Sequence, residues 1–65
     1  MQVSIEEANG TKFLVIRTPI ADPAPLSKSG KTFVVASSYG NKSFADVQVN
    51  GKPVTIGLNA YVKKD

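Results

Sequence analysis

Two Asn-Gly dipeptides constrain this chain more than any other feature of its sequence. They are Asn9-Gly10 and Asn50-Gly51, and each lies between segments in which apolar and polar residues alternate. Asn-Gly favours a two-residue type I′ turn, because both central residues of that turn need a positive φ. We therefore predict two β-hairpins, one centred on each dipeptide.

The residues around the first dipeptide agree on one strand register. With Asn9-Gly10 as the loop, Glu7 faces Lys12 as a cross-strand pair of opposite charges. Side chains alternate between the two faces of a strand, so the same count sets the next pairs on that face. These pairs are apolar: Ile5 opposite Leu14, and Val3 opposite Ile16.

The second dipeptide predicts a hairpin with one apolar and one polar face. Proline has no N–H, and at a pair that is not hydrogen-bonded the missing N–H points away from the partner strand. Pro53 falls at such a pair, so we expect a free edge on that side of its strand. The predicted pairs are Val47 with Val54, Ala45 with Ile56, Val49 with Lys52, and Gln48 with Pro53.

The rest of the chain also predicts β-structure, so the expected fold class is all-β. Residues 31–38 have the composition of a strand, and the apolar alternation from Val54 to Val62 predicts a long last strand with a bend or bulge at Gly57. No segment shows a helical period over ten or more residues. The expected fold is one domain over residues 1–65, a five-stranded small barrel or curled sheet: a hairpin at 1–18, a proline-rich crossover at 19–30 and a three-strand meander at 31–65.

The length raises the question of what stabilises such a fold. The chain has 65 residues and neither Cys nor His, which excludes disulfides and thiolate or histidine metal sites as staples. Phe13 and Val15 lie on the second face of the first hairpin, which is left uncovered when the other face packs on the meander. We predict a homo-oligomer, with a symmetric dimer as the default, and Phe13 and Val15 as its interface.

Catalysis is not expected. Ser29-Gly30-Lys31-Thr32 looks like the end of a phosphate-binding P-loop, but Pro25 stands where the motif needs its first glycine. A strand follows, whereas the motif needs a helix. No serine has a base placed beside it, and no pair of carboxylates suits acid/base work. We predict a protein that is not an enzyme and that needs no cofactor and no metal.

The charge leaves a second binding role open. The formal net charge is +3, and Arg17 is the only arginine, so a polyanion is permitted as a partner while base-specific recognition by arginine is not expected. Small β-barrels bind single-stranded nucleic acid with a basic groove and aromatic rings. Alternatively, the lysines keep a β domain soluble and the tyrosines cover its ends. The predicted nucleic-acid-binding residues are Lys28, Lys31, Tyr39, Lys42, Tyr61 and Lys63.

Several short motifs in the last two-thirds of the chain form a recurring pattern. They are Gly30-Lys31-Thr32, Val34-Val35-Ala36-Ser37, Gly40-Asn41, Val49-Asn50-Gly51-Lys52 and Gly57-Leu58-Asn59-Ala60-Tyr61. This pattern resembles a set of short bacterial and phage-type β proteins of no established function. Turn and strand residues carry the resemblance, so it implies a shared fold more than a shared activity. The leading functional prediction is a self-associating, non-catalytic interaction module, and the alternative is a weak single-stranded nucleic-acid binder without sequence preference.

The N-terminal residues do not have the pattern of a signal peptide, which needs a positive region followed by an apolar one. The longest strictly apolar run, Phe13-Leu14-Val15-Ile16, is too short to cross a bilayer. We therefore expect a cytoplasmic protein without a membrane partner.

Overall fold

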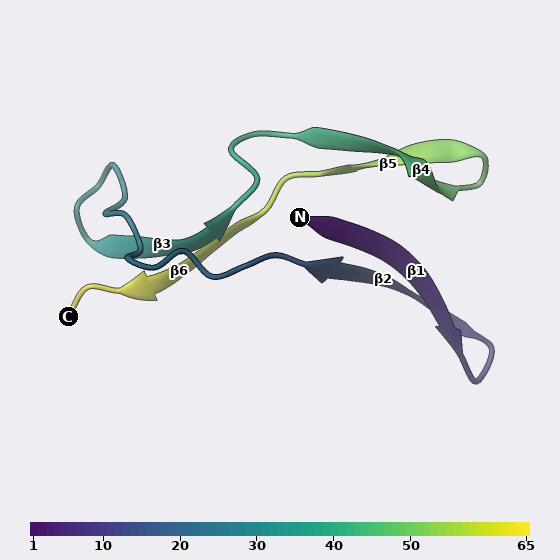
Figure 1. Cartoon of the computed structure of the whole chain (residues 1–65), viewed down its shortest axis with the longest axis horizontal. Coiled ribbons are helices and arrows are strands. Elements are labelled where there is room, and N and C mark those ends of the chain that lie inside the picture. Colours follow the sequence, from purple (N-terminus) through teal and green to yellow (C-terminus); the bar gives the residue numbers. More distant parts are fainter.

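The computed structural model describes all 65 residues and contains six strands and no helix. The strands form three antiparallel pairs: β1 (Gln2–Ala8) with β2 (Thr11–Arg17), β3 (Thr32–Ser37) with β6 (Asn59–Lys63), and β4 (Lys42–Val49) with β5 (Lys52–Ile56). The all-β class is confirmed. Six strands form where five were expected, and they make separate two-stranded ribbons with no closed barrel (Figure 1).

The first hairpin has the predicted register throughout. Ile5 lies opposite Leu14, and the pairs on either side follow the same count from Gln2 opposite Arg17 to Ala8 opposite Thr11. Asn9 has a φ of 54° and Gly10 one of 79°, as a type I′ turn requires. Local turn chemistry and side-chain alternation therefore determine β1 and β2 together.

Strands β3 to β6 form one long hairpin, so the predicted three-strand meander is wrong. β3 and β4 follow each other along one arm and β5 and β6 along the other, which pairs β3 with β6 and β4 with β5. Figure 1 shows the two arms bending together where β3 passes into β4. The chain kinks at residues 38–41 but does not reverse there, so β3 and β4 never become neighbours.

Ser38 joins the two arms at this kink. Its N–H donates to the carbonyl oxygen of Leu58 at 2.9 Å, and its Oγ accepts the N–H of Leu58 at 2.8 Å. The same hydroxyl donates to the carbonyl oxygen of Gly40 at 2.6 Å. The Ser38 side chain thus supplies the acceptor that the strand backbone would supply if β3 continued, and Ser38 is only 3% exposed.

The opposite arm bends at Gly57, as predicted. β5 ends at Ile56 and β6 begins at Asn59. A Cβ atom on Gly57 would lie 2.5 Å from Oδ1 of Asn41, so a larger residue at this position would displace the Asn41 side chain.

The second Asn-Gly turn forms, but only its first pairs have the predicted register. Val49 lies opposite Lys52 and Gln48 opposite Pro53, whereas the next pair is Phe44 with Val54. Residues 45–47 have no partner on β5, so the predicted pairs of Val47 with Val54 and Ala45 with Ile56 are wrong. Nε2 of Gln48 donates to the carbonyl oxygen of Ala45 at 3.2 Å across this bulge.

The proline-rich connection lies along the outer edge of β3. The N–H of Ala21 donates to Val35 at 2.8 Å, the N–H of Val34 donates to Pro25 at 2.8 Å, and the N–H of Ser27 donates to Thr32 at 2.9 Å. The connection carries the chain from the first hairpin to the second, as the crossover prediction required. It also acts as an irregular third strand that covers one edge of β3.

The three ribbons share very little core. Val47 is 8% exposed and Ile56 is 6% exposed, and no other apolar residue is buried. Between strands, the first hairpin approaches the second where β1 meets β4, and residues of β2 share a hollow with the β4–β5 turn. The molecule measures 41 × 24 × 16 Å. No helix in the structure is long and apolar enough to cross a membrane.

Candidate functional site

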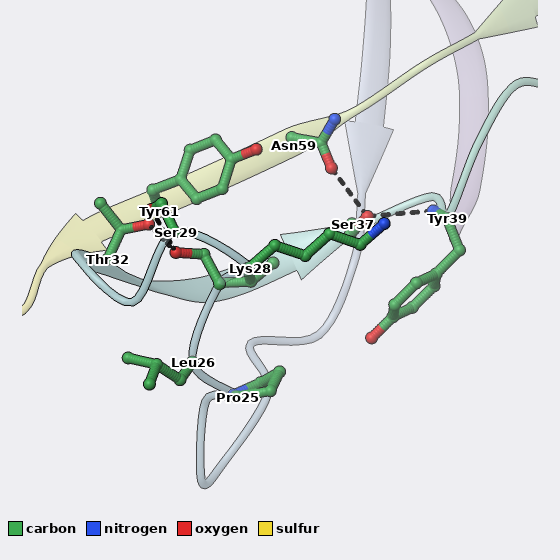
Figure 2. A pocket seen from close by; sticks show the side chains of 11 residues that line it. Pro25, Leu26, Lys28, Ser29, Thr32, Ser37, Tyr39, Asn59 and Tyr61 are labelled. Carbon is green, nitrogen blue, oxygen red and sulfur yellow. Dashed lines mark hydrogen bonds between the residues drawn. The ribbon is translucent and has the colours of Figure 1, made fainter.

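A groove of about 600 Å³ follows one face of the β3–β6 ribbon (Figure 2). The two strands supply its floor, the end of the proline-rich connection supplies one wall, and Tyr39 stands at the kink. The lining residues are Pro25, Leu26, Ser27, Lys28, Ser29, Thr32, Val34, Ser37, Tyr39, Asn59 and Tyr61. Val34 lies opposite Tyr61 in the ladder, so both side chains project from the same face.

Hydrogen bonds tie the groove wall to its floor. Oγ1 of Thr32 donates to Oγ of Ser27 at 2.7 Å, which fixes the connection against β3. At the other end Oγ of Ser37 donates to Oδ1 of Asn59 at 2.8 Å and joins β3 to β6. The groove is therefore framed by side-chain bonds as well as by the backbone ladder.

The groove brings together three of the predicted nucleic-acid-binding residues. Lys28, Tyr39 and Tyr61 all line it, and in Figure 2 the Lys28 side chain extends along the groove between the two rings. Tyr39 is 81% exposed and Tyr61 is 54% exposed. Neither ring is buried as a cover for the fold, so both offer faces to a ligand.

Two more predicted residues lie where the groove reaches the chain terminus. Lys31 and Lys63 line a second hollow together with Lys64 and Asp65. Thr32 lines both hollows, so the second continues the first along the ribbon. Lys42 does not join them, because it begins β4 on the far side of the kink.

Sequence reasoning missed several residues of the groove. Asn59 lies two residues before Tyr61 on one strand, and that spacing alone puts both on one face. Ser37 and Leu26 carried no such signal, because their place depends on the pairing of β3 with β6 and with the proline-rich connection. Lys64 joins the second hollow because its N–H donates to the carbonyl oxygen of Lys31 at 3.1 Å.

The predicted oligomer interface lies on β2, away from the groove. Phe13 is 51% exposed, while Val15 is half-buried. The other face of the hairpin, which was expected to pack on the meander, is also open: Leu14 is 49%, Ile5 39% and Ile16 36% exposed. Both faces of the hairpin therefore present apolar side chains.

No group of three or more Asp or Glu side chains comes together to hold a metal ion. Ser38 is the one buried serine, and its Oγ donates to the carbonyl oxygen of Gly40 and accepts the N–H of Leu58. These bonds give its hydroxyl a structural role. The lining of the groove offers a positive charge, hydrogen-bonding groups and aromatic faces.

No family model, no curated protein and no solved structure matches this chain. The resemblance to short bacterial and phage-type proteins stays an expectation, and the function has to be argued from the chain itself.

Proposed function

We propose that this chain is a non-catalytic β module that works as a homodimer. The observation that carries the proposal is its surface. The chain exposes 5287 Å², whereas a compact monomer of 6.9 kDa exposes about 4,000 Å². The difference of roughly 1,300 Å² per chain is the area that each partner buries in an obligate homodimer.

The shape and the backbone support the same conclusion. The radius of gyration is 14.5 Å, and a compact domain of 65 residues has about 11 Å. The chain makes 26 backbone–backbone hydrogen bonds, where a folded domain of this length makes about 45. Open strand edges account for part of this shortfall, and pairing with a second chain supplies some of the missing partners.

The edge of β2 is the one best suited to receive that partner. β1 lies near β4, β3 is covered by the proline-rich connection, and Pro53 interrupts the outer edge of β5. β2 has no hydrogen-bonded neighbour on its outer side, and its centre, 13–16, is entirely apolar. An open apolar edge is a template for pairing with another chain.

A two-fold axis beside Leu14 gives the best register for this pairing. In a two-residue hairpin the pair next to the turn is hydrogen-bonded and pairs then alternate, so the N–H and C=O of Leu14 point outward. Antiparallel pairing then sets Leu14 against Leu14 of the partner subunit. Phe13 then meets Val15 of the partner subunit, so the two predicted interface residues complete each other.

Charge substitutions at position 14 test this register. Leu14→Lys and Leu14→Glu each place two like charges opposite one another across the axis, so each variant alone is expected to show a monomer mass by light scattering. An equimolar mixture of the two restores the dimer with one copy of each, because the facing charges are now opposite.

Ile5→Lys is the matched control, because Ile5 lies directly opposite Leu14 on β1 and is exposed to a similar extent. This variant is expected to stay dimeric. A monomer mass for the unsubstituted chain at tens of micromolar would refute the proposal. A dimer that forms from either charged variant alone would refute this edge as the interface.

A further inference from the structure

The groove on the β3–β6 ribbon has features that self-association through β2 does not use. It lies on a different ribbon from β2 and no strand of the first hairpin lines it. It holds two exposed aromatic rings and one lysine in a folded frame. These three side chains are suited to a ligand that has flat faces and negative charge.

Tyr39 is held in a backbone conformation that tyrosine rarely adopts. Its φ is 53°, in the left-handed region where a bulky residue is an outlier. Its N–H donates to Oγ of Ser37 at 3.0 Å, and Ser38 and Gly40 are joined on either side of it. Strain of this kind gathers at binding sites, and here the strained backbone sets an 81% exposed ring beside the groove.

The charge along the ribbon is one-sided. Lys28 lines the groove, and Lys31, Lys63 and Lys64 line its continuation, where Asp65 is the only acidic side chain. The remaining acidic residues lie in β1, in the proline-rich connection and in β4. The groove and its continuation therefore form a basic track about the length of the ribbon.

We propose that this track binds single-stranded nucleic acid, with bases stacked on Tyr39 and Tyr61 and phosphates beside the four lysines. A single strand exposes base faces and a regular series of negative charges, and these are what the track can recognise. An acidic peptide would satisfy the lysines but leave both rings unused. No arginine lies in the track, so little preference for base sequence follows.

Fluorescence anisotropy with a labelled oligothymidylate at low salt tests the proposal. The unsubstituted chain is expected to bind, and Tyr39→Ala and Tyr61→Ala are each expected to weaken binding at least about fivefold, the loss of one stacked base. Tyr39→Phe and Tyr61→Phe keep an aromatic face and are expected to bind as the unsubstituted chain does. The slope of log affinity against log salt should be about −3 if all four lysines engage phosphates.

Lys28→Ala is compared with Lys52→Ala, which removes the same charge from the tip of the β4–β5 hairpin. Only Lys28→Ala is expected to weaken binding. Equal losses of affinity in Lys28→Ala and Lys52→Ala would show a general attraction to polyanions and would refute the proposed site. Weaker binding in the lysine variants with none in the tyrosine variants would refute it in the same way. An acidic peptide that competes as well as the unlabelled oligonucleotide would also overturn it.

Tyr39→Gly separates a lost contact from a lost fold. Glycine adopts positive φ freely, so this variant should keep its melting temperature and its light-scattering mass and yet lose binding. A flat titration with the unsubstituted chain would reject the nucleic-acid site and leave the homodimer proposal untouched, because the mass measurement decides that proposal separately.

Discussion

The two hairpins begin from the same turn and end as different structures. Asn9 and Asn50 both have a φ of 54°, and the glycines that follow have φ values of 79° and 75°. The β1–β2 ribbon then runs without interruption and buries no side chain, while the long hairpin of strands β3 to β6 is bulged, kinked and holds the only buried apolar residues, in β4 and β5. The regular ribbon leaves its faces and edges open, whereas the irregularities of the long hairpin build its core and its groove.

The largest expected difference between the two hairpins lies in their cores. Ile56→Ala removes a side chain that is 6% exposed and is expected to lower the free energy of unfolding by about 2–4 kcal/mol. Ile5→Ala, at a position that is 39% exposed, should cost about 1 kcal/mol. Urea unfolding at one fixed protein concentration measures both, since the stability of the proposed dimer would depend on concentration. Equal losses would mean that the first hairpin holds a core of its own.

Both hairpins also show how far sequence reasoning reaches. The register of β1–β2 could be predicted because the turn and the apolar alternation agree over the whole ribbon. In β4, Phe44 and Val47 are an odd number of residues apart, so a regular strand cannot turn both to one face. The structure inserts the unpaired residues 45–47 and sets Phe44 opposite Val54.

The kink could not be predicted from local signals. Tyr39 and Gly40 both have positive φ, with values of 53° and 101°, and Ser38-Tyr39-Gly40-Asn41 reads as a reversing turn. Whether such a segment reverses or kinks depends on what its flanks pair with, and that partner, β6, lies more than twenty residues away. The same long-range pairing brings Tyr61 and Asn59 to the groove, which is why the sequence indicated the aromatic and basic residues but not the site's full lining.

Ser38 tests the kink directly and gives the second-largest effect. Ser38→Ala leaves the N–H of Leu58 without its acceptor at a site that is 3% exposed, and we expect a loss of about 1–3 kcal/mol. Ser43→Ala is the control, because its Oγ bonds Oγ1 of Thr55 at 3.0 Å across the same two arms but at an exposed position. The control should lose less than about 0.5 kcal/mol. If the two variants unfold at the same urea concentration, the hydrogen bonds of Ser38 to Leu58 do not stabilise the pairing of the two arms.

The two Asn-Gly turns should contribute equally to the free energy of unfolding, although the ribbons that they connect do not. Gly10→Ala and Gly51→Ala each force a Cβ into a positive-φ position with open space around it, which costs about 1–2 kcal/mol. Nothing within 4 Å crowds either position, so the backbone conformation alone sets the cost. Thermal unfolding followed by circular dichroism should show matched shifts. A much smaller shift for Gly10→Ala would mean that the first hairpin unfolds separately from the rest.

The smallest expected change in stability concerns the edges of the two hairpins. The outer edge of β5 is interrupted by Pro53, while the outer edge of β2 carries no proline and no charge at its centre. Pro53→Val gives β5 an outward N–H and a side chain suited to a strand, so the free energy of unfolding should change by less than about 0.5 kcal/mol. What should change is association, because an open edge accepts another strand. Light scattering over a concentration series should then show species larger than those of the unsubstituted chain for Pro53→Val and none for Pro53→Lys, whose charge keeps the edge protected. If Pro53→Val leaves the mass unchanged at every concentration, an open edge on this chain is not enough for pairing, and the proposed dimer would need the apolar side chains of β2 for its specificity.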